Sequence, residues 1–245
     1  ISRTRVWKLL QGYRDHAPAD LDGIAEIIVR LSRLVCDCER IVDVDINPFV
    51  VSATTMIALD ARVRIGTRDA PLAIKPYPNG LTRVVAVGSV GNFLLRPIRP
   101  EDGTRLERFF ARLSPEDIRY RFFAPLRSLP STLLSRLTQI DYDREMALVL
   151  LDGEEIVGVS RLVADPDNTN AEFAVLVRSD LKSRGLGSVM LRNLIEYARG
   201  RGLAALTGEV LEDNVRMIAL CREFGFRLEA AASGAVRATL RLQGE

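Results

Sequence analysis

A basic turn with two glycines is the part of this sequence best suited to bind a charged ligand. The stretch KSRGLGS contains Lys182, Arg184, Gly185, Gly187 and Ser188, and it joins an apolar strand pattern to an amphipathic helical pattern. The N–H groups at the start of a helix lack partners within the helix, and the helix dipole makes this end positive. Such a turn can bind a phosphate or diphosphate group. Its spacing matches neither a P-loop nor a complete dinucleotide fingerprint, so a helix entered through a flexible turn is the alternative interpretation.

The composition describes an ordinary globular protein. The chain has 245 residues, 47% hydrophobic residues and a net charge of +2, which gives no argument for a nucleic-acid or membrane partner. It shows no signal peptide and no apolar run of about 18 residues. Three cysteines form no disulfide framework or zinc motif, which favours a reducing cytoplasm. The single histidine, His16, is assigned no catalytic role.

Residues 1–66 are predicted to form a small α+β unit. Apolar residues at helical spacing predict a helix in ADLDGIAEIIVRLSRLVCD, with Asp20 as its N-cap. The stretch IVDVDINPFVV alternates as a strand until Pro48 interrupts it, and TTMIALDARVRI is expected to pair with it as a hairpin. Residues 67–92, which include APLAIKPYPNG, are rich in proline and glycine and are interpreted as a linker.

Residues 93–245 alternate between strand and helix patterns and predict an α/β domain. The expected order is a strand, helices, a hairpin, and then strand, helix, strand, helix and strand. The hairpin MALVLLDGEEIVGVSRLVA turns at Asp152-Gly153, a pair that suits a tight primed turn. The helix after Gly187 and a later helix in EDNVRMIALCREFGF complete the unit.

The second unit resembles the GNAT superfamily of acyl-CoA-dependent N-acyltransferases. The turn is similar to the diphosphate loop of that family, Gln/Arg-x-x-Gly-x-Gly/Ala, with Lys182 at the Gln/Arg position. EDNVRMIALCREFGF resembles the last helix of the family. The resemblance implies a mixed, mostly antiparallel sheet flanked by helices. It also implies acetyl-CoA as acyl donor, held by a strand that parts from its neighbour over residues 173–177.

The resemblance implies a role for a set of residues along this path. The diphosphate is expected on the N–H groups of residues 184–188, Asn214 is expected near the thiol end, and a backbone N–H near Leu176 is expected to polarise the thioester carbonyl. The donor-binding residues are therefore Leu176, Val177, Lys182, Arg184, Gly185, Leu186, Gly187, Ser188 and Asn214. For Asn214, an ordinary helix cap is a compatible second role.

Glu172, upstream of the turn, is the candidate catalytic base. A lysine amine has a pKa of about 10.4 and is protonated at neutral pH, so it must lose a proton before it attacks a thioester. A carboxylate partly withdrawn from water can accept that proton. A glutamate at this position is the base in some GNAT enzymes. A solvated glutamate at the strand end is the alternative.

The chain departs from the family pattern at the proton donor. Many GNAT enzymes carry a tyrosine seven residues after the asparagine that begins the last helix, and here that position is Cys221. A cysteine can donate a proton in principle. It is also a small apolar residue suited to a core, in which case the thiolate leaves unaided or takes a proton from water.

The first unit resembles the C-terminal end of the ATP-grasp subdomain of ADP-forming acyl-CoA synthetases. In that family the acid and the asparagine of Asp-Ile-Asn-Pro bind magnesium with ATP, which corresponds to Asp45 and Asn47 here. Most of an ATP-grasp domain is not visible in this sequence. Magnesium and ATP are therefore expected only in the context of a complete domain.

The combination of the two units resembles bacterial protein lysine acetyltransferases. It implies transfer of acetyl from acetyl-CoA to a lysine of a partner protein, such as an AMP-forming acyl-CoA synthetase. Two alternatives are open: acetylation of a small amine, and a non-catalytic acyl-CoA sensor.

Overall fold

The protein divides into two compact units in this computed structural model. The units are Ile1–Pro76 and Tyr77–Glu245. The structure describes residues 4–12, 17–38, 40–67, 75–88 and 90–242, and His16 lies outside these ranges. No helix in these ranges is long and apolar enough to cross a bilayer.

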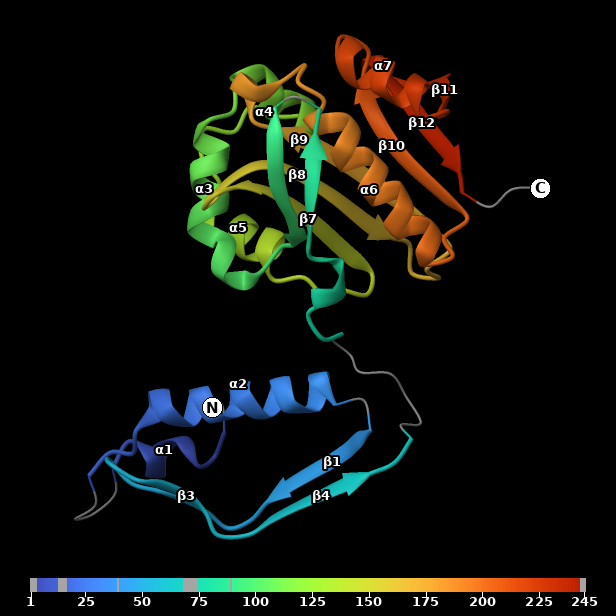
Figure 1. Cartoon of the computed structure of the whole chain (residues 1–245). Helices are drawn as coiled ribbons and strands as arrows, with labels where there is room; N and C mark the ends of the chain where they lie inside the picture. Colours follow the sequence, from blue (N-terminus) through green and yellow to red (C-terminus); the bar gives the residue numbers. More distant parts are fainter. Residues whose placement is uncertain (1–3, 13–16, 39, 68–74, 89, 243–245) are drawn as a thin grey trace. The chain divides into compact units, whose positions relative to one another are not determined.

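The first unit pairs two helices with two short antiparallel ladders (Figure 1). The carboxylate of Asp20 accepts a hydrogen bond from the N–H of Gly23 at 2.9 Å, which confirms the predicted N-cap. The helices are α1 (Trp7–Leu10) and α2 (Leu21–Asp37), and the strands are β1 (Ile41–Ile46), β2 (Phe49–Val51), β3 (Met56–Ala58) and β4 (Ala61–Ile65).

The predicted hairpin of the first unit is confirmed. β1 pairs with β4, and β2 pairs with β3, both antiparallel, with Pro48 between β1 and β2. Little of the unit is shielded from solvent, and Ile41, with 7% of its surface exposed, is the only buried residue among those the structure describes there.

The second unit is built on an eight-stranded sheet. Its strand order is β11-β12-β10-β9-β8-β7-β6-β5, and the pair β9–β10 is parallel whereas the others are antiparallel. This mixed sheet matches the predicted α/β class. The strands are β5 (Arg83–Val87), β6 (Gly91–Pro97), β7 (Glu145–Asp152), β8 (Glu155–Ala164), β9 (Asn170–Val177), β10 (Ala205–Leu211), β11 (Arg227–Ala230) and β12 (Ala235–Arg241).

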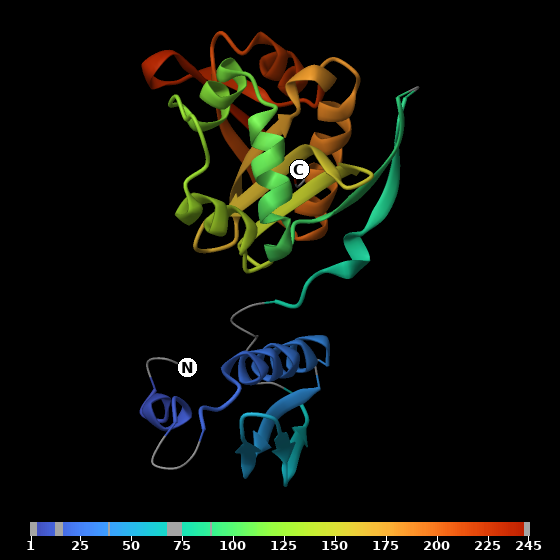
Figure 2. The ribbon, with the colours of Figure 1, turned by 90° about the vertical axis from the view of Figure 1, so that its left-hand side faces the viewer.

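Helices cover both faces of this sheet, and each face has its own apolar core (Figures 1 and 2). On one face α6 packs against β8 and β9 around Met190 and Leu194, which are fully buried. On the other face α3 packs on β8 around Phe109 and Phe110. The helices are α3 (Gly103–Ala111), α4 (Pro115–Phe122), α5 (Ser131–Thr138), α6 (Leu186–Gly200) and α7 (Val215–Glu223), with short 3-10 turns at η1 (Asn79–Leu81), η2 (Pro100–Asp102), η3 (Ser179–Leu181) and η4 (Ala232–Gly234).

The parallel strands β9 and β10 part after a short paired segment. They pair only from Asn170 to Glu172 on β9, opposite Ala205 to Thr207 on β10. On its other edge β9 pairs with β8 from Ala171 to Val177. The predicted divergence over residues 173–177 is therefore confirmed.

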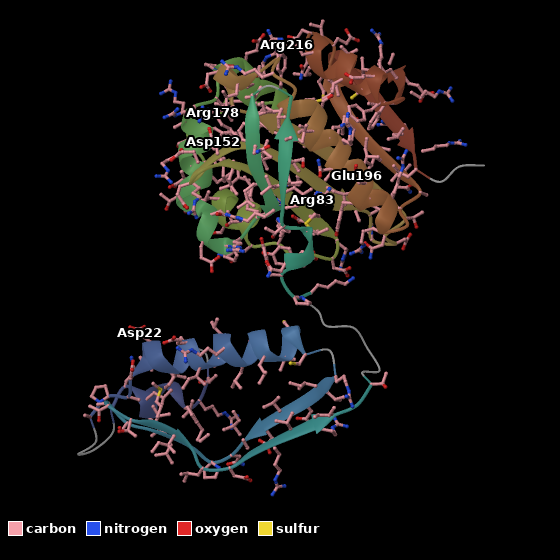
Figure 3. All side chains as sticks on the ribbon, viewed as in Figure 1. Asp22, Arg83, Asp152, Arg178, Glu196 and Arg216 are labelled. Carbon is pink, nitrogen blue, oxygen red and sulfur yellow. The ribbon has the colours of Figure 1, made fainter. Side chains whose placement is uncertain are left out.

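The predicted linker, residues 67–92, extends too far. Residues 68–74 lie outside the described ranges, and Arg83–Val87 forms the edge strand β5 of the second unit. Arg83 binds α6 through Asn193, with 3.1 Å between Nε and Oδ1, and through Glu196 at 3.0 Å (Figure 3). The short RVVAV pattern follows a proline- and glycine-rich stretch, so only pairing with β6 identifies it as a strand.

Gly208 is required where the two strands part. A Cβ at this position would stand 2.7 Å from the Phe173 ring, which in turn packs against Phe226 with 4.9 Å between ring centroids. We expect Gly208→Ala to lower the free energy of unfolding by about 1–3 kcal/mol through overpacking. Chemical denaturation measures this change. Gly200→Ala is the control, because a Cβ at Gly200 meets no atom within 4 Å, and an equal loss in both variants would contradict the explanation.

Candidate active site

A cavity of about 470 Å³ opens where β9 and β10 part. Its walls come from β9, β10, α4, the turn before α6, and α7. Of the residues predicted to bind the donor or to act as base, it is lined by Glu172, Leu176, Val177, Lys182, Gly185, Gly187, Ser188 and Asn214. The fold thus brings together side chains that are separated by up to 42 positions (214 − 172) in the sequence.

The edge of β9 that faces the cavity carries unpaired backbone groups. Arg178 donates its N–H to Val157 on β8 at 2.9 Å, and the register places Leu176 directly opposite Val159. Because backbone groups alternate along a strand, the N–H of Leu176 also faces β8. The groups on the cavity edge belong to Phe173, Val175 and Val177, so the N–H expected near Leu176 to polarise a bound carbonyl would be that of Val175 or Val177, and this role stays a prediction. Leu176 itself is one of the residues that line the cavity.

The turn before α6 has the backbone shape expected of an anion-binding loop. Ser183 and Gly185 adopt left-handed conformations, with φ of 59° and 90°. The N–H of Val189 bonds to the carbonyl of Gly185 at 3.1 Å, so the preceding N–H groups at Leu186, Gly187 and Ser188 have no partner within the helix. These donors and the positive end of α6 can hold a diphosphate.

Three of the predicted loop residues differ in what their side chains do. Leu186 is buried at 1% exposure, so only its backbone can serve a ligand. Arg184 is exposed and does not line the cavity. Lys182 does line it, but its ammonium group is ion-paired with the buried carboxylate of Asp117. The charge of Lys182 is thus already compensated by the protein.

Asp117 ties this loop to α4. It accepts hydrogen bonds from Lys182 and from the hydroxyl of Ser179, and its own N–H donates to Ser114 Oγ at 3.1 Å. Asp117 has only 2% of its surface exposed. A carboxylate buried to this degree is stable only with such partners. The network therefore fixes the loop relative to the N-terminus of α4.

Glu172 lies on the cavity wall and is exposed. It is the third residue of β9 (Asn170–Val177), because pairing with β8 and β10 extends the strand upstream of it. It interacts electrostatically with Arg121 on α4: burial lowers the pKa of Arg121, whereas the Glu172 carboxylate raises it. The protein alone does not withdraw Glu172 from water, so that part of the prediction depends on bound ligands.

The last predicted positions are Asn214 and Cys221. Asn214 lines the cavity and caps α7, since its Oδ1 accepts the N–H of Met217 at 3.2 Å. Cys221 has 0% exposure and belongs to the core below α6. Burial raises the pKa of its thiol to about 11. The structure therefore places Cys221 among core residues and away from the cavity.

Sequence reasoning missed residues that only the tertiary structure brings to the cavity. They are Asp117, Tyr120, Arg121, Phe123 and Arg216. The first four lie in and just after α4, which was predicted as a helix without a site. Arg216 lies in the first turn of α7, next to the recognised Asn214 (Figure 3). Its position beside a predicted site residue was a usable signal.

Asp45 and Asn47 do not form a metal site by themselves. Both are exposed, and no group of three or more histidine, cysteine, aspartate or glutamate side chains suited to a metal exists in the described ranges. The magnesium prediction for these two residues applies only to a chain that holds the complete ATP-grasp domain.

Family models match both units. The model of the acetyltransferase (GNAT) family matches residues 114–226, and an ATP-grasp domain model matches residues 1–65. An acetyltransferase of Pseudomonas aeruginosa is 37% identical over 137 residues, covering 54% of this chain and 74% of the relative. The crystal structure of the GNAT domain of S. lividans PAT aligns with a TM-score of 0.64 and 29% identity, covering 67% of this chain and 99% of that domain.

Two further relatives differ in what they share with the chain. An L-methionine sulfoximine/L-methionine sulfone acetyltransferase of Pseudomonas aeruginosa is 39% identical over 57 residues, which is 23% of this chain and 33% of the relative. The ADP-forming acetate–CoA ligase II of Archaeoglobus fulgidus is 24% identical over 212 residues. These cover 83% of this chain but 29% of the ligase.

The backbone shape of the turn predicts different effects at its two glycines. Gly185→Ala forces a side chain into a left-handed conformation, which costs about 1–2 kcal/mol, and we expect CoA affinity to fall about tenfold. Gly187→Ala is expected to reduce it less than about threefold, because the new Cβ would lie 3.6 Å from Leu220, an ordinary contact. Isothermal titration calorimetry with CoA measures both. An equal loss in both variants would show that loop shape is not the determinant.

Proposed function

Because the chain belongs to the GNAT family of acetyltransferases, we propose that it transfers acetyl from acetyl-CoA to the ε-amine of a lysine in a partner protein. Family membership makes it an N-acyltransferase. The finer points, which are the donor, the lysine acceptor and the partner, constitute the proposal. The observation that carries it is the position of Glu172, an exposed carboxylate on the wall of the cavity between the parted strands.

The donor extends along the free edge of β9. The pantetheine arm carries amides, which can pair with the backbone groups of Phe173, Val175 and Val177 as an added strand would. Its diphosphate binds the N–H groups at the start of α6. Arg216, an exposed cation that lines the same cavity, adds charge near that end. The fit of an amide-bearing chain to an unpaired strand edge supports acetyl-CoA as the donor.

Glu172 acts as the base. It accepts a proton from the incoming ammonium group, and the resulting amine attacks the carbonyl carbon of the thioester. An N–H group on the cavity edge of β9 that pairs with no pantetheine amide stabilises the negative charge that develops on the carbonyl oxygen. The C–S bond then breaks, the nitrogen releases its second proton to water, and the thiolate takes a proton from water.

The cavity also suits the aliphatic part of a lysine side chain. Phe123, directly after α4, lines the cavity and has 49% of its surface exposed. An exposed aromatic ring at a cavity wall offers an apolar surface to the four methylene groups of lysine. Phe123 therefore supports an acceptor that carries a long apolar segment ahead of its amine.

The ATP-grasp piece at residues 1–65 favours a protein acceptor. The fusion of such a piece to a GNAT domain resembles protein lysine acetyltransferases, and their targets include AMP-forming acyl-CoA synthetases. We propose a partner of that kind, in the cytoplasm, and no nucleic-acid or membrane partner.

A second candidate function is the acetylation of a small amine. The relative named as an L-methionine sulfoximine/L-methionine sulfone acetyltransferase shares 39% identity over 57 residues with this chain. Its printed name describes a small acceptor, which favours this alternative for the same cavity.

Labelled acetyl-CoA distinguishes the two acceptors. The purified chain is incubated with an AMP-forming acyl-CoA synthetase in one reaction, and with methionine sulfone or lysine in another. We expect label on a lysine of the protein, located by mass spectrometry. Label on the free amines alone would replace the leading proposal with the second.

Glu172→Gln tests the catalytic base. The amide keeps the shape of the side chain but cannot accept the proton, so we expect turnover to fall about 10²- to 10⁴-fold. The affinity for acetyl-CoA, measured by calorimetry, should change less than about twofold. Glu107→Gln on α3, an exposed residue outside the cavity, is the matched control. Full turnover in the Glu172 variant would remove Glu172 from the mechanism.

A further inference from the structure

Arg121 stands at the junction of two cavities. It lies in the last turn of α4, is half-buried, and lines the large cavity together with Glu172 and Phe123. It also lines a smaller adjoining cavity of about 40 Å³ between α3 and the sheet. Ala174 and Leu176 on β9 line both cavities as well, so the two are neighbours across Arg121.

The walls of the smaller cavity around Arg121 are mainly apolar and supply no anion. In the smaller cavity they include Phe110, Phe122 and Leu129. The guanidinium group lies 5.1 Å from the centroid of the Phe122 ring. Within the described part of the chain, Arg121 makes neither an ion pair nor a hydrogen bond, whereas Glu172 affects it only through the longer-range electrostatic interaction.

The neighbouring Arg161 shows how this fold compensates a cation that stays in place. Arg161 on β8 is buried at 6% exposure, and it pairs with the Glu145 carboxylate at 3.1 Å and donates to the carbonyl of Leu137. The two arginines repel each other, which lowers the pKa of Arg161 further after the larger effect of burial. Arg121 lacks both kinds of partner. The C-terminal end of α4 supplies only a partial negative charge.

We propose that Arg121 binds a carboxylate group of the acceptor substrate, next to the amine that receives the acyl group. The inference rests on the proposed acyl transfer to an amine and deepens it by naming a second feature of the acceptor. A cation withdrawn from water without a partner is unfavourable, and an incoming carboxylate compensates it. The guanidinium fork can hold a carboxylate through two parallel hydrogen bonds.

Two charges of the cavity wall, those of Glu172 and Arg121, then match two charges of the acceptor. Glu172 faces the ammonium group, and Arg121 faces the carboxylate. A lysine with an aspartate or glutamate close to it in a protein carries both groups, and so does a free amino acid with its α-carboxylate. Both acceptors share an amine with a nearby carboxylate. The test uses one acceptor of each kind, so it distinguishes a carboxylate of a protein from the α-carboxylate of a free amino acid.

Pairs of acceptors that differ only in this carboxylate test the inference. One pair is a short lysine peptide with aspartate or glutamate within two positions of the lysine, and the same peptide with asparagine or glutamine. The other pair is methionine sulfone and its carboxamide. Initial rates of acetylation are measured at a fixed saturating acetyl-CoA concentration with the parent chain, Arg121→Gln, Arg121→Lys and Arg127→Gln.

For the acidic acceptors we expect Arg121→Gln to raise KM about 10- to 100-fold. This is the loss of affinity expected when hydrogen bonds between a guanidinium group and a carboxylate are removed. The KM for the uncharged acceptors and the affinity for acetyl-CoA should change less than about twofold. Arg121→Lys keeps the positive charge but loses the planar guanidinium fork. Its KM for the acidic acceptors should lie between those of the parent chain and Arg121→Gln. Arg127→Gln removes the same charge from an exposed position outside both cavities and should behave as the parent.

The outcomes separate this inference from the proposed function. If the selective loss occurs with peptides, the carboxylate belongs to a protein; if it occurs only with methionine sulfone, it is the α-carboxylate of a small acceptor. A uniform fall in kcat for all acceptors, with a shifted pH profile, would overturn the inference and assign Arg121 to positioning Glu172. Acetylation by the parent chain without preference for acidic acceptors would also overturn it. No acetylation of any amine would instead contradict the proposed function.

Discussion

The parting of β9 from β10 is the constraint on which the site depends. Two parallel strands that pair for three residues and then separate leave a row of backbone N–H and C=O groups unpaired on β9. Unpaired backbone groups away from water are unfavourable, so the gap favours either solvent or a ligand that carries its own amides. Phe173 and Gly208 help to shape this gap, because the ring occupies the space that a larger residue on β10 would need. A chain molecule with amide groups fits this edge for the same reason that a further strand would.

Charge in the cavity is divided between groups that the protein compensates and groups that it leaves to ligands. Lys182 and Asp117 neutralise each other and fasten the loop to α4. Glu172, Arg121 and Arg216 line the same cavity, and none of them is ion-paired within the described part of the chain. The anion-binding capacity of the loop therefore comes mainly from backbone N–H groups and the dipole of α6, and less from Lys182 than the basic character of the turn indicates.

The N-terminal unit forms the helix and hairpin ladders expected of an ATP-grasp piece, and its described residues form no metal-binding cluster. Its hairpin ladders and helix cap form as the local sequence predicts. Asp45 and Asn47 are exposed, and the described residues place too few further ligands beside them to bind a metal. Magnesium needs several oxygen ligands, and two residues two apart on a strand supply only part of such a set. The unit thus has the local features of an ATP-grasp domain, and Asp45 and Asn47 alone do not complete a magnesium site.

The sequence by itself determined those features that depend on short-range patterns. The glycine turn with its left-handed Gly185, the caps at Asp20 and Asn214, and the amphipathic α6 all follow from residues within one or two helical turns of each other. The tertiary structure decided which backbone edge of β9 faces the cavity, and it placed Leu176 against β8. It also decided that Lys182 pairs with Asp117, that Arg121 and Phe123 share the cavity with Glu172, and that Arg83–Val87 joins the sheet. These features depend on strand register and on contacts between residues far apart in the chain, which no local spacing encodes.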